Sequence, residues 1–296
     1  MTSPRASFLR ELVSARRDLQ HLASQGERHD TWFDGARTRW RRWGDGPDLV
    51  LIHGGHGSWM HWARNIDGLA SRFQLWLPDM PGFGESDALP GHPHDPNRQQ
   101  RLIGSLAAGL SQLPMSGAGI GIAGFSFGGL VAAQLATTTA THVQRLALLG
   151  TAGHGGQRRQ ADELMNWRQT RGLERWQAHA LNLQRLMLHD SASIDAQALL
   201  AHACSSHATR YRSKAISRDA RLPDILATYR DDLLLVWGEH DVTALPSEIG
   251  RVLLDGRDHR HLHIVPDAGH WVQYEQSDLC NGILTAWFGD KTPPAS

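Results

Sequence analysis

The sequence predicts an α/β fold with a mostly parallel central sheet, flanking helices and an inserted helical cap. Short, continuous apolar runs recur along the chain, and each run is bounded by glycine, proline or aspartate. Stretches of helical periodicity separate these runs, which is the pattern of strands buried on both faces of a parallel sheet. A stretch of about 70 residues without strand signals interrupts the alternation, and we interpret it as the cap.

Residues 1–27 predict an amphipathic helix. Their apolar side chains recur at helical spacing, at Phe8, Leu9, Leu12, Val13, Leu19 and Leu22. Charged residues such as Arg10, Glu11 and Asp18 interrupt the stretch, so it is not a signal peptide. We expect this helix to pack on the body of the protein, the alternatives being a contact between subunits and a surface tether.

The core, residues 28–150 and 223–290, begins with a hairpin. Residues 31–33 and 38–43 predict two strands around the turn Asp34-Gly35. The later predicted strands are the apolar runs 49–52, 73–77, 120–123, 146–149, 233–237 and 262–265.

The cap occupies residues 151–222. It opens with the flexible run Gly153-His154-Gly155-Gly156 and then predicts helices over 161–171, 173–188 and 196–202. At the other end of the core, residues 291–296 contain two prolines and are expected to form a frayed tail.

Composition excludes several classes of function. The chain has 296 residues with 30 basic and 30 acidic side chains, and this balance argues against a nucleic-acid partner, which normally requires a basic face. No apolar run reaches the roughly 18 residues of a membrane span. The two cysteines, Cys204 and Cys280, exclude a disulfide framework and favour a reducing, cytoplasmic compartment. The sequence leaves the oligomeric state open, a homo-oligomer included.

The sharpest motif is Gly-Phe-Ser-Phe-Gly-Gly at residues 124–129, which follows a predicted strand and precedes a helical run. A serine on so tight a turn adopts a strained conformation, so small residues must stand two positions to either side. The turn presents the Ser126 hydroxyl at the carboxyl edge of the sheet. The N–H of Phe127 begins the helix, where it can stabilise an oxyanion. We predict that Ser126 is a nucleophile, the alternative being a structural glycine-rich turn.

A serine nucleophile requires a base and an orienting carboxylate, and in this type of fold both follow it along the chain. One later strand runs into Gly-Glu-His-Asp, where Asp241 is the expected acid and Glu239 its competitor. The next strand runs into Pro-Asp-Ala-Gly-His, where His270 is the expected base. Both residues should project from the sheet edge that carries Ser126. The other nearby histidines lie within or before strands or in the wrong loop phase, namely His240, His261 and His263.

From about residue 31 to residue 287 the chain resembles the α/β-hydrolase fold family. The resemblance rests on His53-Gly54-Gly55 after an early strand, on the run 79–86 after the next strand, on the serine turn and on the loops that carry Asp241 and His270. It implies that the Gly55 N–H is the second oxyanion donor beside that of Phe127. It also implies that Asp79 fixes a loop.

Within this family, residues 269–275 are similar to hydrolases that cleave a carbon–carbon bond in vinylogous 1,5-diketones from aromatic ring fission, and so is the spacing of His53 and Trp62. Those enzymes tend to have asparagine where Phe125 and Arg64 stand here, and both asparagines help to hold the dienolate. A cap arginine usually contributes as well, and the candidates are Arg168, Arg171, Arg175, Arg185, Arg210 and Arg212.

Other motifs carry less weight. Residues 119–124 match a dinucleotide fingerprint formally but lie within a strand, so nucleotide binding is not expected. The paired histidines at 92 and 94 and at 261 and 263 have no recognised zinc spacing, and we predict neither a metal nor a cofactor. The candidate pocket residues near Ser126 are His56, Phe125 and Trp271.

These observations predict a hydrolase whose partner is a small-molecule substrate, a carboxylic ester, thioester or lactone that passes through an acyl-enzyme on Ser126. Carbon–carbon cleavage of a ring-fission ketone is the alternative reaction. Two alternatives of other classes are a small-molecule sensor without turnover and a cofactorless lyase or oxygenase on the same scaffold.

Overall fold

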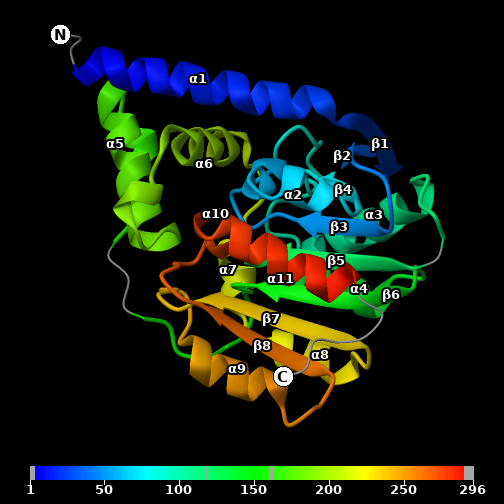
Figure 1. The fold of residues 1–296 in the computed structure, drawn as a ribbon. Helices are drawn as coiled ribbons and strands as arrows, with labels where there is room; N and C mark the ends of the chain where they lie inside the picture. The colour runs from blue at the N-terminus through cyan, green and yellow to red at the C-terminus, as the bar shows by residue number, and fades with distance from the viewer. Residues whose placement is uncertain (1–3, 118, 160–162, 290–296) are drawn as a thin grey trace.

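The structure, a computed structural model, describes residues 4–117, 119–159 and 163–289 (Figure 1). Its centre is an eight-stranded sheet in the order β1-β2-β4-β3-β5-β6-β7-β8. β2 runs antiparallel to β1 and to β4, and every other neighbouring pair is parallel. The predicted α/β fold with a mostly parallel sheet is therefore confirmed.

The strands follow the apolar runs of the sequence. In the central strands almost every side chain is buried, because helices cover both faces of the sheet. At the edge of the sheet, in β8, both His263 and Ile264 are exposed. The bounds are β1 (Glu27–Phe33), β2 (Ala36–Trp43), β3 (Asp48–Ile52), β4 (Gln74–Pro78), β5 (Ile120–Phe125), β6 (Val143–Leu149), β7 (Asp232–Gly238) and β8 (Arg260–Val265).

Two apolar clusters form the core, one on each face of the sheet. Alternate residues of each strand enter opposite clusters, as Leu49 and Val50 do on β3. The first cluster packs the sheet against α2 (Ile66–Ala70), α10 (Val272–Glu275) and α11 (Ser277–Gly289). The second packs it against α3 (Arg98–Gln112), α4 (Phe127–Thr138), α8 (Leu222–Thr228) and α9 (Pro246–Leu254).

The N-terminal helix α1 (Pro4–Gln25) lies across the core and the cap (Figure 1). It ends just before Gly26, and Glu27 already belongs to β1, so the helix is shorter than the predicted 1–27. Its buried side chains join the first cluster together with residues of the cap helix α6 (Ala196–Ala208). The indole N–H of Trp43 donates to the Leu22 carbonyl, which anchors α1 to β2.

The segment between β6 and β7 is helical for most of its described length, but its first predicted helix is wrong over 163–166. These residues are exposed, and the Asn182 side chain bonds to both the N–H and the carbonyl of Met165. The turns and helices that follow are η2 (Trp167–Gln169), α5 (Gly172–Asn182), the π-helical turn η3 (Leu183–Met187), η4 (Ser191–Ser193), α6 and α7 (Lys214–Arg218).

α8 begins at Leu222, a residue of the second core cluster, but Tyr211 within the predicted cap already belongs to the same cluster. The predicted frayed tail, residues 291–296, lies outside the described residues. No helix in the described ranges is both long enough and apolar enough to cross a membrane.

Candidate active site

Ser126 occupies a strained turn between β5 and α4. Its backbone has φ +54° and ψ −119°, a conformation that costs energy for any residue other than glycine. The flanking glycines are required by packing. A Cβ on Gly124 would lie 2.3 Å from the Gly128 carbonyl oxygen, and a Cβ on Gly128 would lie 2.3 Å from the His53 carbonyl oxygen. The small residues predicted around the serine therefore allow the turn to form.

His270 connects Ser126 to Asp241. Its Nε2 lies 3.0 Å from Ser126 Oγ, and its Nδ1 lies 2.8 Å from Asp241 Oδ2. Asp241 follows β7 and His270 follows β8, so all three side chains meet at the carboxyl edge of the sheet. With Nδ1–H donated to the carboxylate, Nε2 is the acceptor for the serine hydroxyl.

Thr243 holds the carboxylate of Asp241 in place. Its N–H and its hydroxyl donate to Asp241 Oδ1 at 2.7 and 2.8 Å, which leaves Oδ2 for His270. Burial opposes ionisation of Asp241, but the charge and hydrogen bond of His270, together with the Thr243 bonds, outweigh it and lower the pKa of this carboxyl. Asp241 is therefore an anion at neutral pH. Sequence reasoning did not single out Thr243, although an Asp-x-Thr turn is a recognisable signal for such a bond.

Two backbone N–H groups flank Ser126, those of Gly55 and Phe127. Neither donates to an acceptor within the described part of the chain. The preceding residue, Gly54, is held at both ends, because His53 bonds to its carbonyl oxygen at 2.8 Å and its N–H donates to His61 Nδ1. Burial keeps the pKa of His53 low and that of His61 well below its usual value, so both rings are neutral. The loop therefore presents the Gly55 N–H from a fixed backbone.

Glu275 supports the loop of His270 from the other side. Its carboxylate accepts the Gly269 N–H at 2.7 Å and the N–H groups of His189 and Asp190 at 3.0 and 2.6 Å. It thus ties the turn between η3 and η4 to the loop that carries His270. The sequence placed Glu275 within a family-like stretch but did not predict this contact.

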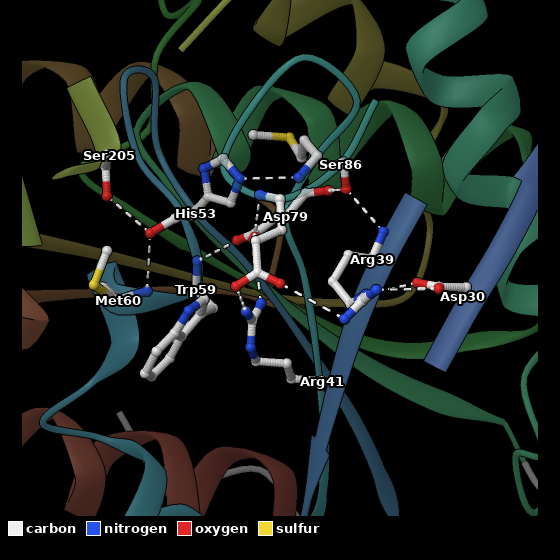
Figure 2. A network of polar contacts seen from close by, with 12 residues as sticks. Asp30, Arg39, Arg41, His53, Trp59, Met60, Asp79, Ser86 and Ser205 are labelled. Atoms are coloured by element: carbon white, nitrogen blue, oxygen red, sulfur yellow. Dashed lines mark hydrogen bonds and ion pairs between the residues drawn. The ribbon is translucent and has the colours of Figure 1, made fainter. Parts of the chain in front are cut away.

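Asp79 organises a buried network of polar contacts (Figure 2). Its carboxylate accepts from the Trp59 N–H at 2.9 Å and the Glu85 N–H at 3.0 Å, and it pairs with Arg41 at 3.1 Å. Ser86 bonds to its backbone carbonyl. These contacts join the loop after β3 to the loop after β4, in agreement with a loop-fixing role.

A cavity of about 730 Å³ opens at Ser126. Of the three predicted pocket residues, His56 and Phe125 line it. Trp271 does not. Its fully buried indole stacks on Tyr274 with ring centres 4.2 Å apart, and its N–H donates to the His61 carbonyl. The turn after His270 directs this side chain into the core, away from the cavity.

The cavity has cationic residues that sequence reasoning missed. Arg158, Arg159, Lys214 and Arg218 line it, whereas none of the six predicted cap arginines does. Arg64, which stands at an asparagine position of the related carbon–carbon hydrolases, lies outside the cavity. It pairs with Asp195 and stacks 4.0 Å above the Tyr274 ring, tying the core to the start of α6.

One group of potential metal ligands lies close together within the described ranges. Oxygen or nitrogen atoms of Glu239, His240 and Asp267 lie within 4.8 Å of one another, near the surface. None of these residues lines the cavity at Ser126.

Comparison with known proteins agrees with this geometry. Residues 49–282 match the model of the alpha/beta hydrolase family. A 2-hydroxy-6-oxononadienedioate/2-hydroxy-6-oxononatrienedioate hydrolase of Escherichia coli is 29% identical over 256 residues, which are 80% of this chain and 85% of the relative.

Solved structures show the same fold. A meta-cleavage product hydrolase from Pseudomonas fluorescens superposes with a TM-score of 0.69 at 22% identity, covering 89% of this chain and 98% of that one. An esterase from Rhodococcus superposes with a TM-score of 0.72 at 18% identity, covering 90% and 100%. We conclude that the chain belongs to the α/β-hydrolase family and is a hydrolase.

Proposed function

We propose that the protein hydrolyses carboxylic esters, thioesters or lactones through an acyl-enzyme on Ser126. The observation that carries this proposal is the pair of contacts from Ser126 Oγ to His270 at 3.0 Å and from His270 to Asp241 at 2.8 Å. Beside them lie two N–H groups that donate to no acceptor among the described residues. A strained serine, a neutral imidazole acceptor and a buried anion together form a nucleophile, a base and an orienting acid.

In this mechanism the Ser126 hydroxyl gives its proton to His270 Nε2 while its oxygen bonds to the substrate carbonyl carbon. The carbonyl oxygen becomes an anion and accepts the N–H groups of Gly55 and Phe127. His270 then returns the proton to the leaving alcohol or thiol as the carbonyl–heteroatom bond breaks. Water repeats the two steps on the acyl-enzyme and releases the acid. Throughout, Asp241 balances the positive charge that His270 acquires.

Carbon–carbon cleavage of a ring-fission ketone is the second candidate, favoured by the similarity to the Escherichia coli hydrolase. Two contacts argue for the ester. Phe125 stands where the carbon–carbon hydrolases tend to have a substrate-holding asparagine, and its apolar ring packs against those of His270 and His61 at 5.0 and 5.4 Å. Arg64 stands at the second such position and is committed to Asp195 and Tyr274. Neither side chain offers the amide that would hold a dienolate.

The test compares p-nitrophenyl esters of graded chain length with a dienolate ring-fission product, in wild type and in Ser126→Ala. We expect turnover of the esters, and a loss of about 10⁴-fold to 10⁶-fold in kcat in the variant. A fluorophosphonate should label wild type and not Ser126→Ala. The control is Ser111→Ala, at an exposed position of α3, which should keep the wild-type rate.

Three outcomes would contradict the proposal. Near-wild-type ester turnover in Ser126→Ala would exclude this nucleophile. Turnover of the dienolate in preference to every ester would favour the second candidate. Binding of esters without multiple turnover would favour a sensor.

A further inference from the structure

The mouth of the cavity at Ser126 carries a strongly asymmetric charge. Four cationic side chains line it, and we call Arg158, Arg159, Lys214 and Arg218 together the cationic rim. Among the described residues that line it, Glu163 is the one with an acidic side chain. The rim and Ser126 belong to one cavity, so a substrate bound at the serine lies in the field of these cations.

The fold itself does not require this concentration of charge. Lys214 and Arg218 are four residues apart on the short helix α7, a spacing at which like charges destabilise a helix. Partial burial and then the charge of Arg218 lower the pKa of Arg158, which shows that the two arginines repel each other across the rim. An arrangement that costs stability at the mouth of a reactive cavity calls for a functional reason.

Within the described ranges, no carboxylate pairs with a side chain of the cationic rim. Elsewhere, arginines commonly find such a partner, as in the pairs Arg39–Asp30, Arg42–Glu27 and Arg64–Asp195. Two of the rim arginines are instead steadied by backbone carbonyls. Arg158 donates to Ser217 at 3.2 Å and Arg159 donates to Glu239 at 2.7 Å. Each guanidinium keeps further N–H donors for an incoming anion.

We propose that the cationic rim binds a carboxylate of the substrate, so that the preferred substrate is an ester carrying a second, anionic carboxyl group away from the bond that is cleaved. This inference rests on the proposed ester hydrolysis and adds a substrate class to it. The rim supplies the counter-charge while the Gly55 and Phe127 N–H groups face the reacting carbonyl. The reacting carbonyl and the anionic end of the substrate thus occupy different parts of one cavity.

The test uses pairs of esters that differ only in this charge. Mono-p-nitrophenyl glutarate carries a free carboxylate on its acyl side, and it is compared with its methyl ester, in which this carboxylate is neutralised. 4-Carboxyphenyl butyrate carries the carboxylate on its alcohol side, and it is likewise compared with its methyl ester. All enzymatic rates are normalised to the rate of hydroxide hydrolysis of the same compound. We expect kcat/KM to favour the charged member of one pair by about 10-fold at low ionic strength, and this preference to shrink as salt screens the rim.

Two double variants distinguish an effect of the cationic rim from an effect of the net charge of the protein. Arg158→Gln/Arg218→Gln should remove most of the preference, because kcat/KM for the charged esters should fall more than kcat/KM for their neutral counterparts. The matched control is Arg230→Gln/Arg251→Gln, which removes the same charge from exposed positions that do not line the cavity and should keep the preference.

Equal kcat/KM for charged and neutral esters in both pairs would overturn the inference, and so would a preference that survives in the rim variant. Failure of the proposed ester hydrolysis looks different, because then no ester of either charge is turned over and Ser126→Ala changes nothing.

Discussion

Two buried aspartates follow parallel strands of the same sheet, and their surroundings differ in one decisive respect. Asp79 follows β4 and pairs with Arg41 at 3.1 Å, while backbone N–H groups occupy its other lone pairs (Figure 2). Asp241 follows β7 and bonds to His270 at 2.8 Å, with Thr243 on its other oxygen. Both carboxylates are almost completely buried and fully bonded.

The partner decides what each carboxylate can do. Arginine does not lose its proton in a protein, so the Asp79–Arg41 pair is a fixed contact between two loops. Histidine gains and loses a proton near neutral pH, so Asp241 can stabilise a charge that appears and disappears on its neighbour. Only His270 reaches a hydroxyl at the wall of a cavity. Position at the edge of the sheet is therefore not enough to make an aspartate reactive.

The largest expected difference is in catalysis. Asp241→Asn should keep the shape of the side chain but lower kcat by about 10⁴-fold, because an amide cannot hold His270 in the required tautomer or balance its positive charge. At neutral pH the free energy of unfolding should fall by less than in Asp79→Asn. The measurement is steady-state kinetics on a p-nitrophenyl ester together with urea unfolding, and a kcat within about 10-fold of wild type would remove Asp241 from the mechanism.

Asp79→Asn should show the opposite balance. The substitution leaves the buried Arg41 with Glu85 as its remaining carboxylate partner, and the Glu85 side chain is half exposed. The free energy of unfolding should therefore fall by about 3 kcal/mol. We expect kcat to fall far less than in Asp241→Asn, since Asp79 supports the loops without touching the reacting groups. Urea unfolding and kinetics at one temperature test both statements. A stable variant with a kcat as low as that of Asp241→Asn would contradict the comparison.

The smallest expected effect is on how the free energy of unfolding depends on pH below neutrality. Because folding lowers the pKa of Asp241 below its unfolded value of 3.8, the ionised group stabilises the fold above that value, and this contribution is lost as pH falls through the folded pKa. The difference in unfolding free energy between wild type and Asp241→Asn should therefore narrow from about pH 6 to about pH 3. Urea titrations at several pH values measure it, with the exposed Asp231→Asn as control. Parallel curves for wild type and Asp241→Asn would contradict the expectation.

The sequence predicts the sheet and the meeting of Ser126, Asp241 and His270 for the same physical reason. Parallel strands end at one edge, so residues that follow different strands are brought together however far apart they lie in the chain. The glycines around Ser126 can be predicted because a tight turn excludes a Cβ at defined offsets.

The structure of the cap is less strongly determined by local sequence patterns, and some of the predictions made for it are wrong. Helical periodicity over 161–171 does not produce a helix at 163–166, because Asn182 satisfies the Met165 backbone and the side chains of these residues stay largely exposed. The choice among cap arginines also fails. Which of them reach the cavity depends on the path of the chain between β6 and α5 and on the placement of α7, and neither is encoded in local spacing.

The sequence by itself determined the fold, the family and the order of Ser126, Asp241 and His270 along the strands, because alternating apolar runs and turn glycines act over a few neighbouring positions. Tertiary structure alone decided that Trp271 enters the core, that Arg64 ties the core to α6 and that the cationic rim surrounds the mouth of the cavity. Those outcomes depend on contacts between segments far apart in the chain. Packing and charge at these contacts select the direction of each side chain, which the neighbouring residues in the sequence do not determine.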